Sequence, residues 1–110
     1  MSSNLIGDFT SGDSLFVQCS LKVDDLAEPL AGSTIELVLK AIGHAEATIT
    51  RSQLVPASPE AAAGTHTLAL TPQQTLVLPG RYSAFLVRIK ANGDRWTFHR
   101  EQLMVLAGAQ

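Results

Sequence analysis

A period of two in the apolar residues constrains this chain more than any other feature of its sequence. Between Ser14 and Val23, every odd position is apolar: Leu15, Val17, Cys19, Leu21 and Val23. The even positions between them are polar except Phe16. Because successive side chains of a β-strand point to opposite faces, this pattern predicts a half-buried strand. The range 34–41 repeats it, with inward-facing Ile35, Leu37, Leu39 and Ala41.

Similar runs between turn residues predict the remaining strands. These runs are a thin edge strand at 45–51 and strands at 65–70, 81–90, 95–100 and 103–106. The strand at 81–90 is apolar on both faces, which is typical of a central strand or of one whose outer face meets a partner. The predicted turns are 24–32, Gly43-His44 and the tight hairpin Ala91-Asn92-Gly93-Asp94.

Three local signals refine this pattern. Pro56 to Gly64 is predicted to be a loop, because two prolines and a glycine leave little length for a helix. Thr71-Pro72-Gln73-Gln74 matches a helix start and predicts one short helical turn. A change of apolar phase near Glu101-Gln102 predicts a β-bulge.

Short strands with frequent turns predict an all-β sandwich or barrel, and one motif favours the sandwich. A tyrosine just inside a strand, after a tight turn, can bond its hydroxyl to the connecting backbone and form a corner. Leu78, Pro79, Gly80 and Tyr82 have this arrangement. The alternative is an ordinary buried tyrosine.

The length and low charge predict one domain that covers residues 1–110. The chain has 110 residues, and only 16% of them are charged. A domain so poor in charge often hides part of its surface against partners. The ends near 1–10 and 107–110 are predicted to be flexible or to become ordered on assembly.

The net charge argues against nucleic acid and membrane surfaces as partners, and the two ends of the sequence lack the features of a bilayer-spanning segment or a signal peptide. The net charge is −2 and the lysines and arginines occur singly, so we expect neither nucleic acid nor a membrane surface as partner. The apolar run from Leu103 to Ala109 is too short to span a bilayer. The first residues lack a basic region and a long apolar core, which predicts synthesis in a cytoplasm without a signal peptide.

No motif in the sequence indicates catalysis, a metal or a cofactor. His44, His66 and His99 are dispersed, and no glycine-rich phosphate loop occurs. Cys19 is predicted to be a small buried hydrophobe. We therefore expect no cofactor, no metal and no enzymatic activity. A glycosidase-like pair of carboxylates far apart in the chain stays open as an alternative.

Trp96 and Phe98 alternate on one predicted strand and offer a possible sugar-binding platform. A tryptophan packed inside the sandwich is the commoner arrangement. The sequence leaves both arrangements open.

Five motifs follow one another in a set order between residues 12 and 106. They are Gly12-Asp13, Leu30-Ala31-Gly32-Ser33-Thr34-Ile35, Leu78-Pro79-Gly80-Arg81-Tyr82, Phe85-Leu86-Val87-Arg88-Ile89 and Asn92-Gly93-Asp94-Arg95-Trp96-Thr97. This order resembles the immunoglobulin-like domain of phage virion proteins, and is similar to the N-terminal domain of baseplate upper proteins and related small tail-associated proteins. Baseplate upper proteins continue into a helical stalk and a receptor-binding platform, which this chain does not include. The resemblance implies an immunoglobulin-like antiparallel β-sandwich of about seven strands and supplies no catalytic residues.

Two functions are expected from these observations. The first is a non-enzymatic virion structural protein of the tail, baseplate or capsid surface, whose partners are other virion proteins and copies of itself. Its candidate interface residues are Phe85, Val87, Ile89, Leu103 and Val105. The alternative is a carbohydrate or cell-surface binding module that uses Trp96 and Phe98.

Overall fold

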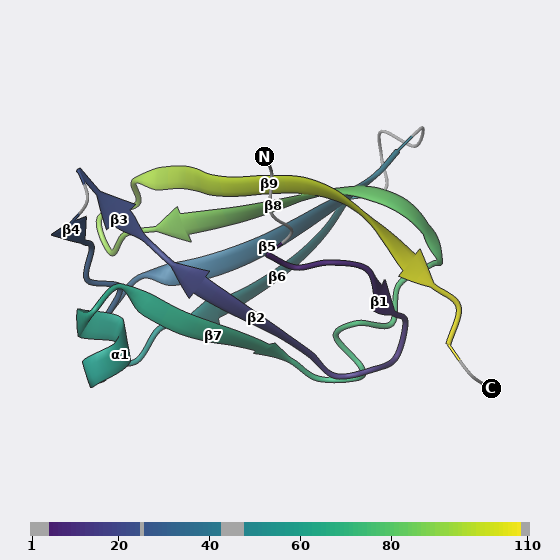
Figure 1. The fold of residues 1–110 in the computed structure, drawn as a ribbon, viewed down its shortest axis with the longest axis horizontal. Helices are drawn as coiled ribbons and strands as arrows, with labels where there is room; N and C mark the ends of the chain where they lie inside the picture. The colour runs from purple at the N-terminus through teal and green to yellow at the C-terminus, as the bar shows by residue number, and fades with distance from the viewer. Residues whose placement is uncertain (1–4, 25, 43–47, 109–110) are drawn as a thin grey trace.

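A computed structural model describes residues 5–24, 26–42 and 48–108 (Figure 1). These residues form nine strands and one short helix. In chain order the elements are β1 (Phe9–Thr10), β2 (Leu15–Ser20), β3 (Lys22–Val23), β4 (Leu26–Ala27), β5 (Thr34–Ala41), β6 (Thr48–Leu54), α1 (Pro59–Ala62), β7 (Thr65–Leu70), β8 (Gly80–Ile89) and β9 (Arg95–Leu106).

The strands form one large sheet and two small ones. The large sheet has the order β1-β9-β8-β5-β6, and its pairs are antiparallel except that β1 runs parallel to β9. β2 pairs with β7, and β3 with β4. In Figure 1 the β2–β7 pair lies over one face of the large sheet. We call this face the inner face and the opposite one the outer face.

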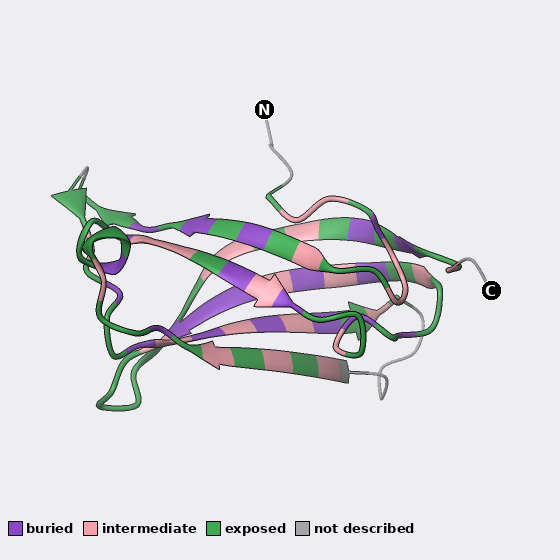
Figure 2. Ribbon diagram, turned by 90° about the horizontal axis from the view of Figure 1, so that it is seen from below, coloured by how far each residue is buried: buried purple, intermediate pink, exposed green. Residues whose placement is uncertain are grey.

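The core fills the space between the β2–β7 pair and the inner face. Figure 2 shows buried residues alternating with exposed or intermediate ones along the strands, as the period of two requires. Core residues from both layers pack together, among them Val17, Cys19, Leu68 and Leu70 from the small sheet and Ile35, Leu37, Leu39 and Leu86 from the large one.

The predicted all-β class is confirmed. β5 and β7 have the predicted bounds, and β8 begins and ends one residue earlier than predicted. The described strands exceed the predicted seven, because β1, β3 and β4 have two residues each and are too short to show a period. The predicted turn at Gly43-His44 and the start of the strand at 45–51 lie outside the described residues.

The single helical turn predicted at Thr71 forms, with the Thr75 N–H bonded to the Thr71 carbonyl oxygen at 3.2 Å, but the assigned helix lies elsewhere. The helix is α1, in the segment predicted to be a loop, where the Ser58 hydroxyl accepts the Ala61 N–H at 3.0 Å and Pro59 occupies the first turn. At Thr71 the expected reciprocal bonds with Gln74 form at 2.9 and 3.3 Å. They close a turn over residues 72–75 that does not extend into a helix.

The predicted bulge at Glu101-Gln102 was also misplaced. The register of β8 against β9 shifts between Leu86 and Val87, which leaves Phe98 as the extra residue. Glu101 stays in phase with the core residue Leu103 and faces inward, opposite Ala84.

The Glu101 carboxylate is satisfied by the N-terminal segment. It accepts the backbone N–H groups of Leu5, Ile6 and Gly7 at 2.9, 3.0 and 2.9 Å, and its Oε1 lies 2.6 Å from His99 Nε2. Three successive N–H groups around one anion form a backbone nest. Residues 5–10 therefore lie along β9 within a single chain.

The corner at the start of β8 contains the expected bond. The Tyr82 hydroxyl donates to the Leu78 carbonyl oxygen at 2.6 Å, and the Tyr82 side chain is buried. Gly80 between them has φ +149°, a conformation that residues with a Cβ rarely adopt. Leu78 and Pro79 are exposed at the turn itself.

Arg88 lies on the inner face at the other end of β8 and is 5% exposed. Its guanidinium donates to Ser33 Oγ at 3.0 Å, to Glu28 Oε1 at 3.0 Å and to the Pro29 carbonyl oxygen at 2.8 Å. A buried guanidinium requires such partners, since an unpaired charge in the interior is strongly unfavourable. Arg88 thus joins β8 to the loop that precedes β5.

Candidate functional site

The outer face of the large sheet carries an apolar stripe, formed by Val38, Phe85, Val87 and Ile89. Cross-strand pairing places Val38 opposite Phe85, and Phe85, Val87 and Ile89 alternate with the core residues of β8. No second sheet covers this face among the described residues (Figure 2), yet Val87 is only 4% exposed. Neighbouring side chains on the same face must therefore shield the stripe from water.

Long cationic side chains provide part of this cover. Lys40 Nζ lies 5.7 Å and Arg100 Cζ 5.8 Å from the centroid of the Phe85 ring. Arg95 pairs with Glu36 at 3.1 Å across the width of β8. The aliphatic stems of such residues pack on apolar surface while their charges stay in water, and a cation near an aromatic ring gains further stabilisation.

The outer face is also the most basic described surface of the sheet. Arg81 lies on it as well, so among the described strand residues of β5, β8 and β9 this face holds four cations, Lys40, Arg81, Arg95 and Arg100, and one acidic residue, Glu36. Along the sequence these cations occur singly, which predicted no basic surface. They gather because the strand pairing brings three strands together, and the bulge at Phe98 places Arg95 and Arg100 on the same face.

The structure separates the candidate interface residues into two groups. Phe85, Val87 and Ile89 lie in the outer stripe. Leu103 and Val105 are 3% and 1% exposed and belong to the core, so they offer no surface to a partner. Their strand, β9, is paired and filled on its inner side, which the apolar run at 103–106 alone did not reveal.

Trp96 and Phe98 do not form an exposed pair. Phe98 is the bulged residue, and its side chain packs against the core. Trp96 is 45% exposed and lies opposite Arg88 near the start of β9. Trp96 is therefore not packed inside the sandwich, and Trp96 and Phe98 do not form a sugar-binding platform of two exposed rings.

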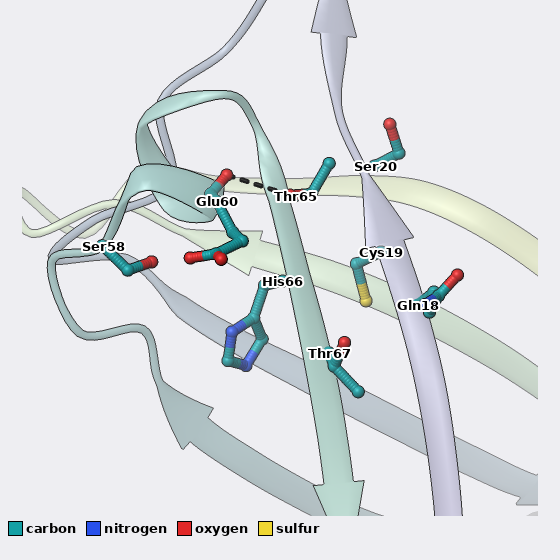
Figure 3. Close-up of a pocket in the computed structure, with 8 residues that line it drawn as sticks. All are labelled: Gln18, Cys19, Ser20, Ser58, Glu60, Thr65, His66 and Thr67. Carbon is teal, nitrogen blue, oxygen red and sulfur yellow. Dashed lines mark hydrogen bonds between the residues drawn. The ribbon is translucent and has the colours of Figure 1, made fainter.

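A second feature is an open polar pocket of about 550 Å³ beside α1. Figure 3 shows Ser58, Glu60 and His66 on one side of β7, with their polar ends toward a common space. His66 Nε2 lies 2.8 Å from Gln53 Oε1, and the Ser58 hydroxyl caps α1. The backbone oxygen of Glu60 accepts the Thr65 hydroxyl at 3.0 Å. The imidazole and the serine hydroxyl of this pocket thus already have structural partners.

Burial sets the protonation of two titratable groups at this pocket. Desolvation raises the pKa of the Cys19 thiol to about 11, so at neutral pH it is the poorly nucleophilic thiol. Desolvation lowers the pKa of His66, which favours the neutral imidazole. The pocket therefore presents uncharged hydrogen-bonding groups and one carboxylate, Glu60.

The described residues contain no metal-ligand cluster. Over residues 5–24, 26–42 and 48–108, no three histidine, cysteine or acidic side chains come together as a metal site. In that part of the chain no helix has the length and apolar character needed to cross a bilayer.

Comparison with known proteins gives a fold and no family. No protein-family model matches the chain, and no curated protein matches its sequence. Among solved structures, a family 76 glycoside hydrolase from a bovine Bacteroides thetaiotaomicron strain is similar with a TM-score of 0.53 and 12% identity. The match covers 89% of this chain and 19% of that chain, so this chain spans about a fifth of the length of the hydrolase.

This match corrects one prediction. We expected no enzymatic activity, because no catalytic motif occurs in the sequence. The same fold is found inside a glycoside hydrolase chain, which contradicts that expectation. At 12% identity the likeness concerns the fold alone, since one fold hosts many functions.

Proposed function

We propose that this chain is an assembly domain of a phage virion that binds neighbouring virion proteins and copies of itself through the outer face of its large sheet. The observation that carries the proposal is the apolar stripe Val38, Phe85, Val87 and Ile89, covered by cations of the same chain. The motif order of phage immunoglobulin-like domains supports the virion setting. Within this proposal the two layers and the tyrosine corner belong to an immunoglobulin-like sandwich.

The chemistry of the outer face favours a particular kind of partner. Aromatic and arginine side chains are enriched in protein interfaces and supply much of their binding energy. Phe85 would be the central anchor, and the cations around it would select a surface that is apolar at its centre and acidic at its rim. On binding, Lys40 and Arg100 would move away from the Phe85 ring and form ion pairs with carboxylates of the partner.

Matched variants on the two outer surfaces of the domain test this proposal. Phe85→Asp should abolish self-association and incorporation into particles, because it removes the apolar anchor at the centre of the interface and replaces it with a carboxylate that Lys40 and Arg100 of the same chain can bind. Phe16→Asp is the control, since Phe16 is 66% exposed on β2, in the other layer. Light scattering of the purified protein and quantitative mass spectrometry of particles give the two readouts.

Charge reversals keep the test independent of folding. Lys40→Glu and Arg100→Glu change exposed side chains and should weaken association while lowering the free energy of unfolding by no more than about 1 kcal/mol each, the loss of one exposed cation–ring contact. A strictly monomeric wild-type protein, together with normal particles assembled in its absence, would contradict the proposal.

A carbohydrate-binding module is the second candidate, and the half-exposed Trp96 favours it. The glycoside hydrolase that contains a similar fold gives this candidate its ligand class. Titration of Trp96 fluorescence with polysaccharides should show saturable quenching, and calorimetric titration should show that Trp96→Phe loses the binding. A flat titration would remove this candidate and leave the assembly proposal unaffected.

A further inference from the structure

The N-terminal segment, residues 5–10, has almost all of its described polar contacts with a single strand. We call it the strap. Its N–H groups at Leu5, Ile6 and Gly7 bind Glu101, and Asp8 Oδ1 accepts the Met104 N–H at 2.9 Å. β1 then pairs with Val105 and Leu106 of β9. The receptor for the strap is therefore one sheet edge with one buried carboxylate.

The strap and the body of the domain are joined by a short hinge, Ser11-Gly12. Gly12 has φ +89°, and the bonds of the hinge to the turn at 75–77 are long: 3.4 Å from Gly12 N to Thr75 O, and 3.3 Å from Val77 N to Ser11 Oγ. The next residue is held more tightly, since the Thr75 hydroxyl donates to the Asp13 carbonyl oxygen at 2.6 Å. β2 is therefore held independently of the strap. Release of the strap breaks the 2.9 Å bond from the Ser11 N–H to the Leu106 carbonyl oxygen and withdraws the Phe9 side chain, which is 8% exposed, from the core.

Release of the strap leaves a specific vacancy on β9. The Glu101 side chain is 5% exposed, and without the three N–H groups its carboxylate is only partly satisfied. The Met104 N–H and the edge of β9 at Val105 and Leu106 also lose their partners. A ligand for this vacancy must present three successive backbone N–H groups, a carboxylate and a two-residue strand, in that order, with an apolar side chain in the place of Phe9.

The strap of a second copy has this chemistry. We propose that copies of this chain exchange their N-terminal straps, so that residues 5–10 of one copy occupy β9 of the next. Every hydrogen bond that breaks within one chain forms again between two chains, which is why exchange of an identical element is a low-cost route to oligomers. The inference rests on the proposed function, because it supplies the connection between neighbouring copies that an assembly domain needs.

Cross-linking between two different variants tests the exchange directly. Thr10 and Leu106 are paired neighbours, and Leu106 is 49% exposed. With Cys19→Ala in every chain, a Thr10→Cys protein is mixed with a Leu106→Cys protein under mild oxidation. Exchange places the two thiols within disulfide distance only across chains. The expected yield of the mixed dimer is at least about tenfold above the control, because exchange raises the effective concentration of the thiols.

Two controls make each outcome decisive. The collision control mixes Thr10→Cys with Leu54→Cys, which is 66% exposed on β6. The geometry control carries Thr10→Cys and Leu106→Cys in one chain and should form a disulfide, between chains where straps are exchanged and within the chain where they are not. Adding Glu101→Gln should make the mixed dimer form several-fold faster, because an amide cannot accept all of the N–H groups that the carboxylate binds and the closed strap is released more readily.

A mixed-dimer yield equal to the collision control, with the internal disulfide formed, would overturn strap exchange. That result would leave the outer-face proposal intact, since the Phe85→Asp and Phe16→Asp pair tests it separately. Conversely, if Phe85→Asp proteins still give the mixed dimer, the exchange stands independently of the outer face.

Discussion

The inner and outer faces of the large sheet carry similar residue types in opposite situations. On the inner face Arg88 is buried, and its guanidinium has three partners within the chain. On the outer face Arg100 is exposed, and its charge lies near the Phe85 ring. The inner arginine is committed to holding the fold, whereas the outer one keeps donors free for another molecule.

The two faces differ although both are apolar, so apolar content alone does not separate core from interface. β8 is apolar on both sides, but only its inner side is packed by a second layer of the chain. On the outer side, long charged side chains take the place of that layer and can be displaced by a partner. Substitutions on the inner face should therefore lower the free energy of unfolding more than substitutions on the outer face.

The largest difference is expected between two neighbours on β5. Leu37 is 1% exposed on the inner face, and Val38 lies half-buried on the outer face. Leu37→Ala should lower the free energy of unfolding by about 3 kcal/mol, because it leaves a cavity. Val38→Ala should cost less than about 1 kcal/mol. Urea unfolding measures both, and equal losses would mean that the outer face is packed like a core.

The two arginines give the next contrast. Arg88→Met should cost about 2–3 kcal/mol, since it leaves the buried Ser33 hydroxyl unpaired, while water can solvate the partly exposed Glu28. Arg100→Met should change stability by less than about 0.5 kcal/mol. The same urea titrations apply. A stable Arg88→Met protein would show that the buried ion pair is dispensable for folding.

A smaller effect is expected at the corner. Tyr82→Phe removes the bond to the Leu78 carbonyl and should cost about 0.5–1.5 kcal/mol. Its neighbour Arg81 points to the outer face, and Arg81→Ala should cost less than about 0.5 kcal/mol. Thermal unfolding of both variants is the measurement. Identical midpoints would show that the corner bond adds nothing to stability.

The smallest effect concerns pH and the inner-face carboxyl of Glu101. Burial raises its pKa, but bonds from Ile6, His99, Gly7 and Leu5 outweigh this and lower the pKa below its ordinary value of 4.5. A lowered pKa in the folded state contributes stability above the unfolded-state pKa, and the contribution is lost as pH falls through the folded-state value. Stability should therefore fall below about pH 4.5, and less so in Glu101→Gln. Urea titrations across pH measure this, and the same pH dependence in both proteins would contradict the role of the carboxylate.

The sequence predicted well where a local signal and the environment agreed. β5 and β7 have the predicted bounds because alternation runs between clear turn residues. α1 was not predicted, although Ser58 and Pro59 are a standard helix start, because four residues are few for a helix. The Thr71–Gln74 bonds form, but no helix follows them.

The features that define the candidate site depend on contacts between distant residues. Glu101 occupies an inward-facing position, so in the sequence it looks like a break in the apolar pattern. The N–H groups that satisfy its carboxylate lie about a hundred residues earlier in the chain, and no local pattern connects them to it. The basic outer face is hidden in the sequence because the bulge at Phe98 reverses the phase of β9, so that an odd and an even residue, Arg95 and Arg100, share one face. No local pattern carries either fact.

The parallel pairing of β1 with β9 also sets an order of events during synthesis. Residues 9–10 leave the ribosome well before their partners at 105–106. Until β9 emerges, β8 is paired on one edge only, with β5, and β1 has no partner strand. A nascent chain therefore stays open along one edge until these residues are made, and closing that edge is the final step by which the domain becomes protected from aggregation.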